Sequence, residues 1–316
     1  MNKAYFEIIR PGIHSTLQDL GRSNQYHIGI PFSGSMDKRN YLISNKLLGN
    51  KLNEPSLEFA YQGPLMKLHS GKVSGTITGN VTFNIIRKNS KIDEGVCYQT
   101  FTLNDGDKLD IISTNRSVYG YFSIKNGFTG EYIWESCSVN TKAKIGSNNG
   151  EKYQSNQKIY INKNESLSEY KKINYLNSKI EYIRVLKGTN FSFFSEKAKK
   201  IFFSNEFIVS KLTDRMGMRL EGPKIENLVE TNIRSEGLIK GVIQVTADGN
   251  PIIMLSDHGT IGGYPKIAVV ISSDYDRLTQ LTPGSKIKFK SVELDEAEKL
   301  YKLYEIETKN ILNQIR

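Results

Sequence analysis

The sequence has 316 residues, of which 38% are hydrophobic and 24% charged, as in a globular protein with room for two cores. Its net charge is +10, but the basic residues are scattered and no nucleic-acid-binding module is recognisable. No stretch approaches the roughly 20 apolar residues that span a bilayer. Residues 1–7 also lack the apolar core of a signal peptide, so we expect a cytoplasmic protein that binds neither membrane nor nucleic acid.

The first conspicuous segment is PGIHSTLQDLGR, at residues 11–22. Glycine and proline beside Gln18, Asp19 and Arg22 are typical of a rigid loop that presents polar groups. Arg22, held by the turn at Gly21, could make a two-pronged contact with a carboxylate or phosphate. Alternatively, Asp19 caps the turn and Arg22 forms an ion pair near the surface.

A helix is predicted next. Ser35 is a plausible N-cap, Asp37 lies favourably in the first turn, and Gly49 would follow the last turn as a C′ glycine. Beyond it, apolar runs such as 109–112 and 118–124 are separated by turns, including an Asp-Gly hairpin signal within 104–107. Regular short strands with turn punctuation predict a mainly β fold of barrels or sandwiches.

Residues 140–177 carry few large apolar side chains and many Asn, Ser, Lys and Glu. We therefore expect an N-terminal β domain at 1–175 and a C-terminal β domain at 176–316. The strand pattern resumes in the second half, with a short helix after Ser195. An amphipathic helix from about Leu294 would pack on its own domain or form a contact between subunits. Further strands are predicted at residues 183–186, 207–209, 242–245, 252–255 and 267–271.

Two arginines stand four residues apart in DRMGMRL, at 214–220. In a strand, Arg215 and Arg219 would point to the same side, where they could grip an acidic substrate. They could equally neutralise Asp214 and Glu221.

The second conspicuous segment, within residues 241–265, is also rich in glycine and polar groups, and we expect it and the first segment to form two walls of one site. Gly262 and Gly263 can adopt backbone angles closed to other residues, so their N–H groups could converge on an anion or oxyanion. Tyr264 adds a hydroxyl, while Asp257 and His258 form a candidate acid–base pair. The alternative is a glycine-rich connection between two strands.

Other familiar chemistry is missing from the sequence. The two cysteines form no CxxC, and none of the four histidines has metal-ligand spacing, so we expect reduced thiols and no metal site. Neither the phosphate-binding sequence GxxxxGK[ST] nor the nucleophile sequence GxSxG occurs.

Several motifs in order resemble the biotin-dependent carboxyltransferase family, also called the allophanate hydrolase subunit 2 family, with members such as the 5-oxoprolinase C subunit and the sporulation regulator KipA. The resemblance implies two cyclophilin-like β-barrel domains with a few short helices and a C-terminal helix. The motifs that carry it are PGIHSTLQDLGR (11–22), GIPFSGSMD (29–37), SNKLLGN (44–50), LEFAYQGP (57–64), DRMGMRLEGP (214–223), the long run 235–274 and QLTPGSKIKF (280–289).

The family implies a small amide or carboxylate substrate handled with a subunit-1-type partner, the KipI-like B subunit. In the oxoprolinase members it implies an ATP-dependent hydrolase that opens 5-oxoproline to glutamate, with a LamB-type A subunit in the hetero-oligomer. We expect ATP to be a co-substrate that the partner could hold and biotin not to be attached to this chain, because no biotin-accepting domain is recognisable in the sequence. The alternatives are a non-catalytic KipA-like regulator that binds a KipI-like kinase inhibitor, and a urea- or allophanate-type carboxyltransferase subunit.

The resemblance also implies roles for residues of the two segments and for Arg215. Arg22 or Arg215 would orient the substrate carboxylate, and the amides of Gly262 and Gly263 would stabilise developing charge. Asp257 or His258 would move a proton. Hydrogen bonds to the substrate amide are expected from Gln18, Gln244 and Tyr264. Together, the expected catalytic residues are Asp257, His258 and Tyr264, and the expected substrate-binding residues are Gln18, Arg22, Arg215, Gln244, Gly262 and Gly263.

The chain departs from the family pattern in the stretch 135–152 and at one further position. Residues 135–139 read ESCSV where the family often has Gly-Ser-Arg-Ser-Thr, and the polar run 146–152 replaces family glycines and an arginine. Thr246 stands where proline is common. If this stretch lines the site, substrate choice or activity is altered, as in a divergent paralogue.

Overall fold

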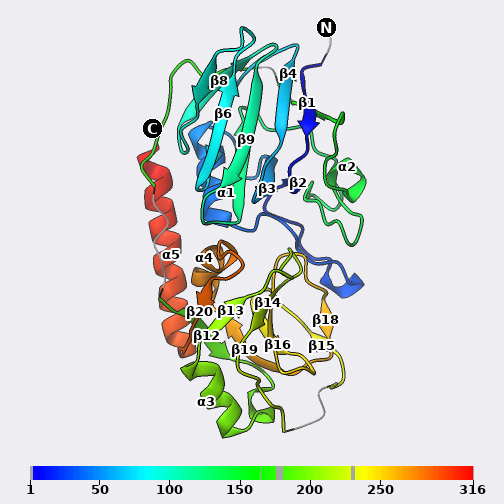
Figure 1. Ribbon diagram of the computed structural model, residues 1–316, viewed down its shortest axis with the longest axis vertical. Helices are drawn as coiled ribbons and strands as arrows, with labels where there is room; N and C mark the ends of the chain where they lie inside the picture. The colour runs from blue at the N-terminus through cyan, green and yellow to red at the C-terminus, as the bar shows by residue number, and fades with distance from the viewer. Residues whose placement is uncertain (1–2, 164, 176–180, 229–231, 316) are drawn as a thin grey trace. The chain divides into compact units, whose positions relative to one another are not determined.

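The computed structural model describes residues 3–163, 165–175, 181–228 and 232–315 (Figure 1). Contacts divide the chain into two compact units, each discontinuous in sequence. Unit 1 comprises Met1–Arg22, Ser33–Leu176 and Thr308–Arg316, and unit 2 comprises Ser23–Phe32 and Asn177–Glu307. The predicted domain boundary between 175 and 176 falls at residues 176–180, outside the described residues, and stays a prediction.

The described part of unit 1 is built from a six-stranded and a five-stranded sheet, both antiparallel. The first has the order β11-β1-β4-β9-β6-β7, with strands β1 (Tyr5–Arg10), β4 (Leu65–His69), β6 (Val81–Ile86), β7 (Ile92–Glu94), β9 (Lys108–Thr114) and β11 (Lys158–Tyr160). The second has the order β2-β3-β10-β5-β8, with strands β2 (His14–Gln18), β3 (Ser56–Ala60), β5 (Lys72–Thr78), β8 (Thr100–Asn104) and β10 (Tyr119–Ile124).

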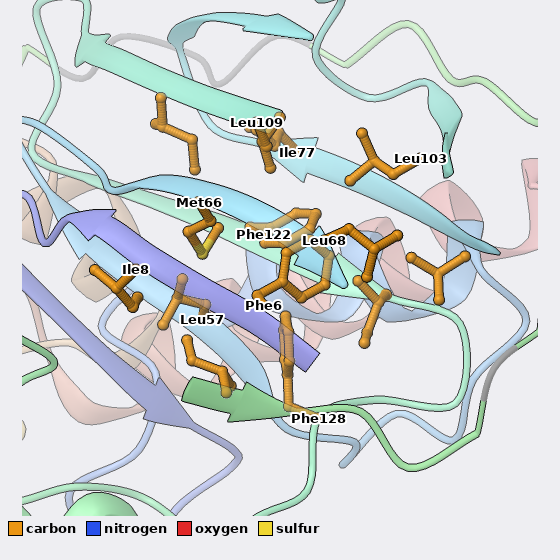
Figure 2. Packing of buried hydrophobic residues seen from close by; sticks show 14 of the residues in the cluster. Phe6, Ile8, Leu57, Met66, Leu68, Ile77, Leu103, Leu109, Phe122 and Phe128 are labelled. Carbon is orange, nitrogen blue, oxygen red and sulfur yellow. The ribbon is translucent and has the colours of Figure 1, made fainter. Parts of the chain in front are cut away.

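One apolar core takes side chains from both sheets of unit 1. Alternation along β1 turns Phe6 and Ile8 inward, where both are fully buried. Figure 2 shows them close to Leu57 and Phe122 of the five-stranded sheet. The rings of Phe6 and Phe122 pack edge to face, with their centroids 5.5 Å apart. Burial of such large side chains from two sheets is what stabilises unit 1.

Helix α1 (Lys38–Leu47) covers part of unit 1, and its start corrects the predicted cap. The N-cap is Asp37, whose carboxylate accepts the backbone N–H of Asn40 at 3.0 Å, and not Ser35. At the other end, Gly49 has φ of 61° directly after the C-cap Leu48, so its predicted role as a C′ glycine is confirmed. The short helix α2 (Ser147–Gly150) lies in the stretch that departs from the family pattern.

Unit 2 contains an eight-stranded, nearly closed sheet of order β20-β13-β14-β17-β16-β19-β12-β21. Its pairings are antiparallel except for the parallel pair β12–β21. Its strands are β12 (Ile183–Lys187), β13 (Phe207–Val209), β14 (Gly217–Glu221), β16 (Val242–Val245), β17 (Pro251–Met254), β19 (Lys266–Val270), β20 (Lys286–Ile287) and β21 (Phe289–Ser291). A separate two-stranded pair joins β15 (Glu236–Gly237) and β18 (Ile261–Gly262).

The predicted helices of the second half are present. Helix α3 (Glu196–Ser204) is capped by Ser195, whose hydroxyl accepts the N–H of Ala198. Helix α4 (Tyr275–Thr279) is short, and helix α5 (Leu294–Gln314) begins where the amphipathic pattern predicted. The mainly β fold with few short helices and a C-terminal helix is therefore confirmed. No described helix combines the length and apolar character needed to cross a bilayer.

Candidate functional site

A buried ion pair joins two predicted site residues of unit 2. Arg215 precedes β14 and Asp257 follows β17, its antiparallel neighbour, so the two side chains meet at one end of this strand pair. The guanidinium donates to both carboxylate oxygens, at 2.8 and 3.0 Å, and the side chains are 5% and 4% exposed. Because both oxygens of Asp257 accept from Arg215, the carboxylate is placed to orient its neighbours more than to move a proton.

The structure corrects the expectation for Arg219. Strand β14 starts only at Gly217, so the alternation that would put Arg215 and Arg219 on one side does not reach back to Arg215. Arg215 is buried, whereas Arg219 is exposed. Glu221 accepts a hydrogen bond from the Ser210 hydroxyl at 2.6 Å. The predicted pair of guanidiniums on one face is wrong.

His258, the second half of the predicted acid–base pair, contacts a tyrosine from far away in the sequence. Its Nδ1 lies 2.5 Å from the carbonyl oxygen of Gly259, which can only accept, so Nδ1 carries a hydrogen. In the neutral ring, Nε2 then accepts the hydroxyl hydrogen of Tyr26, at 2.7 Å. Burial raises the pKa of Tyr26 to about 12. The geometry gives a short proton path from Tyr26 to His258.

Burial lowers the pKa of His258 below its ordinary value of 6.5, and this has a consequence for stability. The unfolded chain takes up the proton more readily, so the contribution of His258 is fully present above about pH 6.5 and falls as the pH drops below it. We expect the difference in free energy of unfolding between wild type and His258→Gln to shrink from pH 7.5 to pH 5.5. Denaturant unfolding at both pH values measures it, and an unchanged difference would contradict the assignment.

Gly262 and Gly263 make room for the atoms packed against them and do not supply unusual backbone angles. Neither Gly262 nor Gly263 has a positive φ, which corrects the reason given for them from the sequence. A Cβ on Gly262 would lie 2.8 Å from both Nε2 of Gln244 and Cδ1 of Leu238. Gln244 also donates to the carbonyl oxygen of Tyr264 at 3.0 Å. Gln244, Gly262 and Tyr264 thus form one contact group.

Gly262→Ala should destabilise the protein by about 1 kcal/mol, the low end for an added methyl group, because the ends of the Gln244 and Leu238 side chains must move aside. Gly237 in the neighbouring strand β15 offers a matched control, since a Cβ there meets nothing within 4 Å. Thermal unfolding of the two alanine variants compares them directly. Equal losses for both would show that the close approach of Gln244 does not matter.

In unit 1, the Asp19 carboxylate holds the first predicted segment. Its Oδ1 accepts from the N–H of Gly21 at 2.8 Å and from the hydroxyls of Ser136 and Ser138, each at 2.6 Å. Its Oδ2 accepts the N–H of Cys137 at 2.8 Å. The Gly21 bond confirms that Asp19 caps the turn. The other partners lie in the stretch where the chain departs from the family pattern, so that stretch touches a predicted binding loop.

Gln18 and Arg22 are buried on either side of Asp19. Gln18 donates to the carbonyl oxygen of Val139 at 2.9 Å, and Arg22 donates to that of Ser138. Arg22 is only 2% exposed, so the alternative of an ion pair near the surface is wrong. A buried guanidinium beside a fixed loop is compatible with the predicted contact to an anion.

The predicted site residues fall into two groups. The seven residues from Arg215 onward lie in unit 2, where Arg215 joins Asp257 and Gln244 joins Gly262 and Tyr264, whereas Gln18 and Arg22 lie in unit 1. That the two groups form one site stays a prediction. Two further residues of these groups are not predicted from the sequence: Tyr26, which no local pattern connects to His258, and Lys266, although its place directly after Gly-Gly-Tyr-Pro is a signal. Among the described residues, no three potential ligands gather as a metal site.

Comparison with known proteins gives consistent matches over nearly the whole chain. The model of the carboxyltransferase domain, subdomain A and B, matches residues 28–291. The C subunit of 5-oxoprolinase from Haemophilus influenzae is 31% identical over 302 residues, covering 96% of this chain and 94% of that protein. The C subunit of the Escherichia coli 5-oxoprolinase is 28% identical, and the match covers 93% of each chain.

Solved structures agree. The crystal structure of the K. lactis urea amidolyase superimposes with a TM-score of 0.87 at 25% identity, over 98% of this chain and 20% of that chain. The chain thus spans about a fifth of the urea amidolyase. A second match, with the Kluyveromyces lactis urea carboxylase, has the same TM-score and covers 29% of that chain. These matches confirm the predicted fold class of two cyclophilin-like β-barrel domains.

Proposed function

This chain belongs to the carboxyltransferase domain family, subdomain A and B, and we propose that it is the C subunit of an ATP-dependent 5-oxoprolinase that opens 5-oxoproline to glutamate. The observation that carries the proposal is the end-to-end match with a protein named as the C subunit of 5-oxoprolinase, over 96% of this chain and 94% of that protein. The urea amidolyase match, over 20% of that chain, supports the family and not the substrate.

Within unit 2, the Tyr26–His258 pair is best arranged to move a proton during amide chemistry. A substrate proton would pass to the Tyr26 oxygen while the Tyr26 hydroxyl hydrogen passes to Nε2 of His258. Burial disfavours the charge of the resulting imidazolium, and its Nδ1–H bond to Gly259 and the negative charge of Asp257 offset part of that cost. This assigns proton transfer to His258 and leaves Asp257 as the anion that Arg215 fixes.

Other parts of the reaction belong to proposed partners, a KipI-like B subunit and a LamB-type A subunit. We assign ATP to one of these partners, because the present sequence lacks GxxxxGK[ST], the loop that most often cradles nucleotide phosphates. The contribution of this chain is then substrate binding, substrate orientation and the proton path through Tyr26 and His258.

The test is 5-oxoproline-dependent ATP hydrolysis by the purified chain alone and with its partner subunits. We expect turnover only in the combination, and a loss of about 100-fold or more for His258→Ala, in line with the usual contribution of a general acid–base group. His69→Ala is the matched control, since His69 pairs with Glu7 on β1 in unit 1. No turnover in any combination, together with tight binding to the KipI-like partner, would contradict the proposal and favour the regulator.

A further inference from the structure

Lys266, the first residue of β19, is a buried cation with an exposed partner. Its side chain is only 4% exposed, and Nζ donates to Oε2 of Glu236 at 2.9 Å and to Oδ1 of Asn190 at 3.5 Å. Glu236 is 44% exposed. A buried ammonium is costly unless an anion accompanies it, whereas a half-exposed carboxylate can return to water at little cost. The cation is therefore fixed and its anion is replaceable.

A primary amide lies beside this cation. Gln244 is the direct cross-strand partner of Lys266 in the β16–β19 pair, and Gly262 is the partner of Glu236 in the β15–β18 pair. One N–H of the Gln244 amide is committed to Tyr264, and no described residue donates to its Oε1. Because Gly262 has no side chain, the amide lies directly against its Cα. An ammonium, an amide and open backbone thus gather around the place that Glu236 fills.

The strand that carries Glu236 is short, and backbone hydrogen bonds from Ile233 to Gly263 and from Leu238 to Thr260 continue its pairing with β18. Strand β15 has only two residues, both exposed, and among the described strands it pairs with β18 alone. The Lys266 ammonium lowers the pKa of the Glu236 carboxyl below its usual value, mainly through their hydrogen bond, so the carboxyl is an anion at neutral pH. A ligand carboxylate has the same charge and the same oxygen geometry.

We propose that Lys266 and Gln244 form a carboxylate-binding subsite, which Glu236 fills in the ligand-free chain and which a ligand carboxylate enters by displacing Glu236. The inference deepens the proposed function and rests on it for the identity of the ligand, because 5-oxoproline carries such a carboxylate next to its amide. It also gives the carboxylate a partner other than Arg215, whose guanidinium already binds Asp257.

The test is a titration of the isolated full chain with 5-oxoprolinate and with propionate, followed by NMR. Glu236→Gln removes the competing charge and should increase the affinity for both carboxylates about fivefold, which corresponds to the free energy of a partly exposed ion pair. Lys266→Met should lower the affinity for both carboxylates about tenfold or more. Glu226→Gln, which removes the same charge from an exposed position, should bind like wild type. The affinity for the neutral lactam 2-pyrrolidinone should be the same in wild type and Glu236→Gln.

Several outcomes would overturn the subsite. These are equal affinities for wild type and Glu236→Gln, an equal gain in Glu226→Gln, or no carboxylate binding by any variant. If Lys266→Met fails to fold, the comparison of the two glutamine variants decides alone. Carboxylate binding with the expected pattern but no turnover with partners would remove the 5-oxoprolinase function and keep the subsite. Turnover with partners, but with equal carboxylate affinity for wild type and Glu236→Gln, would keep the 5-oxoprolinase function and remove the subsite.

Discussion

Asp257→Ala is expected to lower the free energy of unfolding by about 3–5 kcal/mol, the usual cost of removing one partner from a buried ion pair. The reason is the geometry of the pair: Asp257 supplies both of its oxygens to the Arg215 guanidinium, and both side chains are about 5% exposed or less. The variant leaves the guanidinium buried without this anion. Urea unfolding of the full chain at pH 7.5 measures the loss.

Two further variants make this expectation specific. Glu206→Ala removes a carboxylate that pairs with Lys286 and Lys288 at the surface, and should change stability little, because water screens exposed pairs. The double variant Arg215→Met with Asp257→Leu should lose less than Asp257→Ala, since it leaves no buried charge behind. If Asp257→Ala were no worse than Glu206→Ala, the buried pair would contribute nothing to folding.

Features set by neighbouring residues could be predicted from the sequence. Ser195 begins α3 and Gly49 follows α1 as expected, because a cap acts within one turn of its helix. At the start of α1, the predicted N-cap Ser35 lies two residues before the observed N-cap Asp37, and both residue types can cap a helix. Asp37 is the one whose carboxylate accepts the N–H three residues later. Sequence alone does not rank two good caps so close together.

Features set by tertiary contacts could not be predicted. Tyr26 and His258 are 232 residues apart, and Asp19 and Ser138 are 119 apart, so no spacing in the sequence connects them. Lysine is usually exposed, so the sequence does not predict the burial of Lys266, which becomes evident from its place in β19. Sequence reasoning therefore found the residue types of the candidate site and missed its partners.

The stretch that departs from the family pattern shows why such partners matter. The sequence predicts that this stretch alters substrate choice or activity, and its residues Ser136, Cys137 and Ser138 supply three of the four donors to the Asp19 carboxylate. The fourth donor is the backbone N–H of Gly21, within the loop itself. The unusual stretch therefore supports the loop of Gln18 and Arg22, and its effect on function should pass through the position of that loop.

Asp19→Asn tests this support and should cost about 3 kcal/mol of unfolding free energy, the usual scale for buried hydrogen bonds to a charged group. In the wild type, both carboxylate oxygens accept, with three donors on Oδ1 and one on Oδ2. An amide has one acceptor oxygen, so its NH₂ group must face either the Cys137 N–H or the donors at Oδ1. The serine hydroxyls can rotate, but the backbone N–H groups cannot.

Thermal and urea unfolding compare Asp19→Asn with Asp105→Asn, which changes an exposed carboxylate that accepts the N–H of Ser70 at 2.8 Å. The control should lose little, because water replaces its partner. Titration of Asp19→Asn with 5-oxoprolinate adds a second readout. The substitution displaces the loop that carries Arg22, whereas the residues of the Lys266 subsite in unit 2 are unchanged. Stability equal to the control would mean that the loop of residues 18–22 is held by its backbone alone, and that the departing stretch is free to vary without consequence for it.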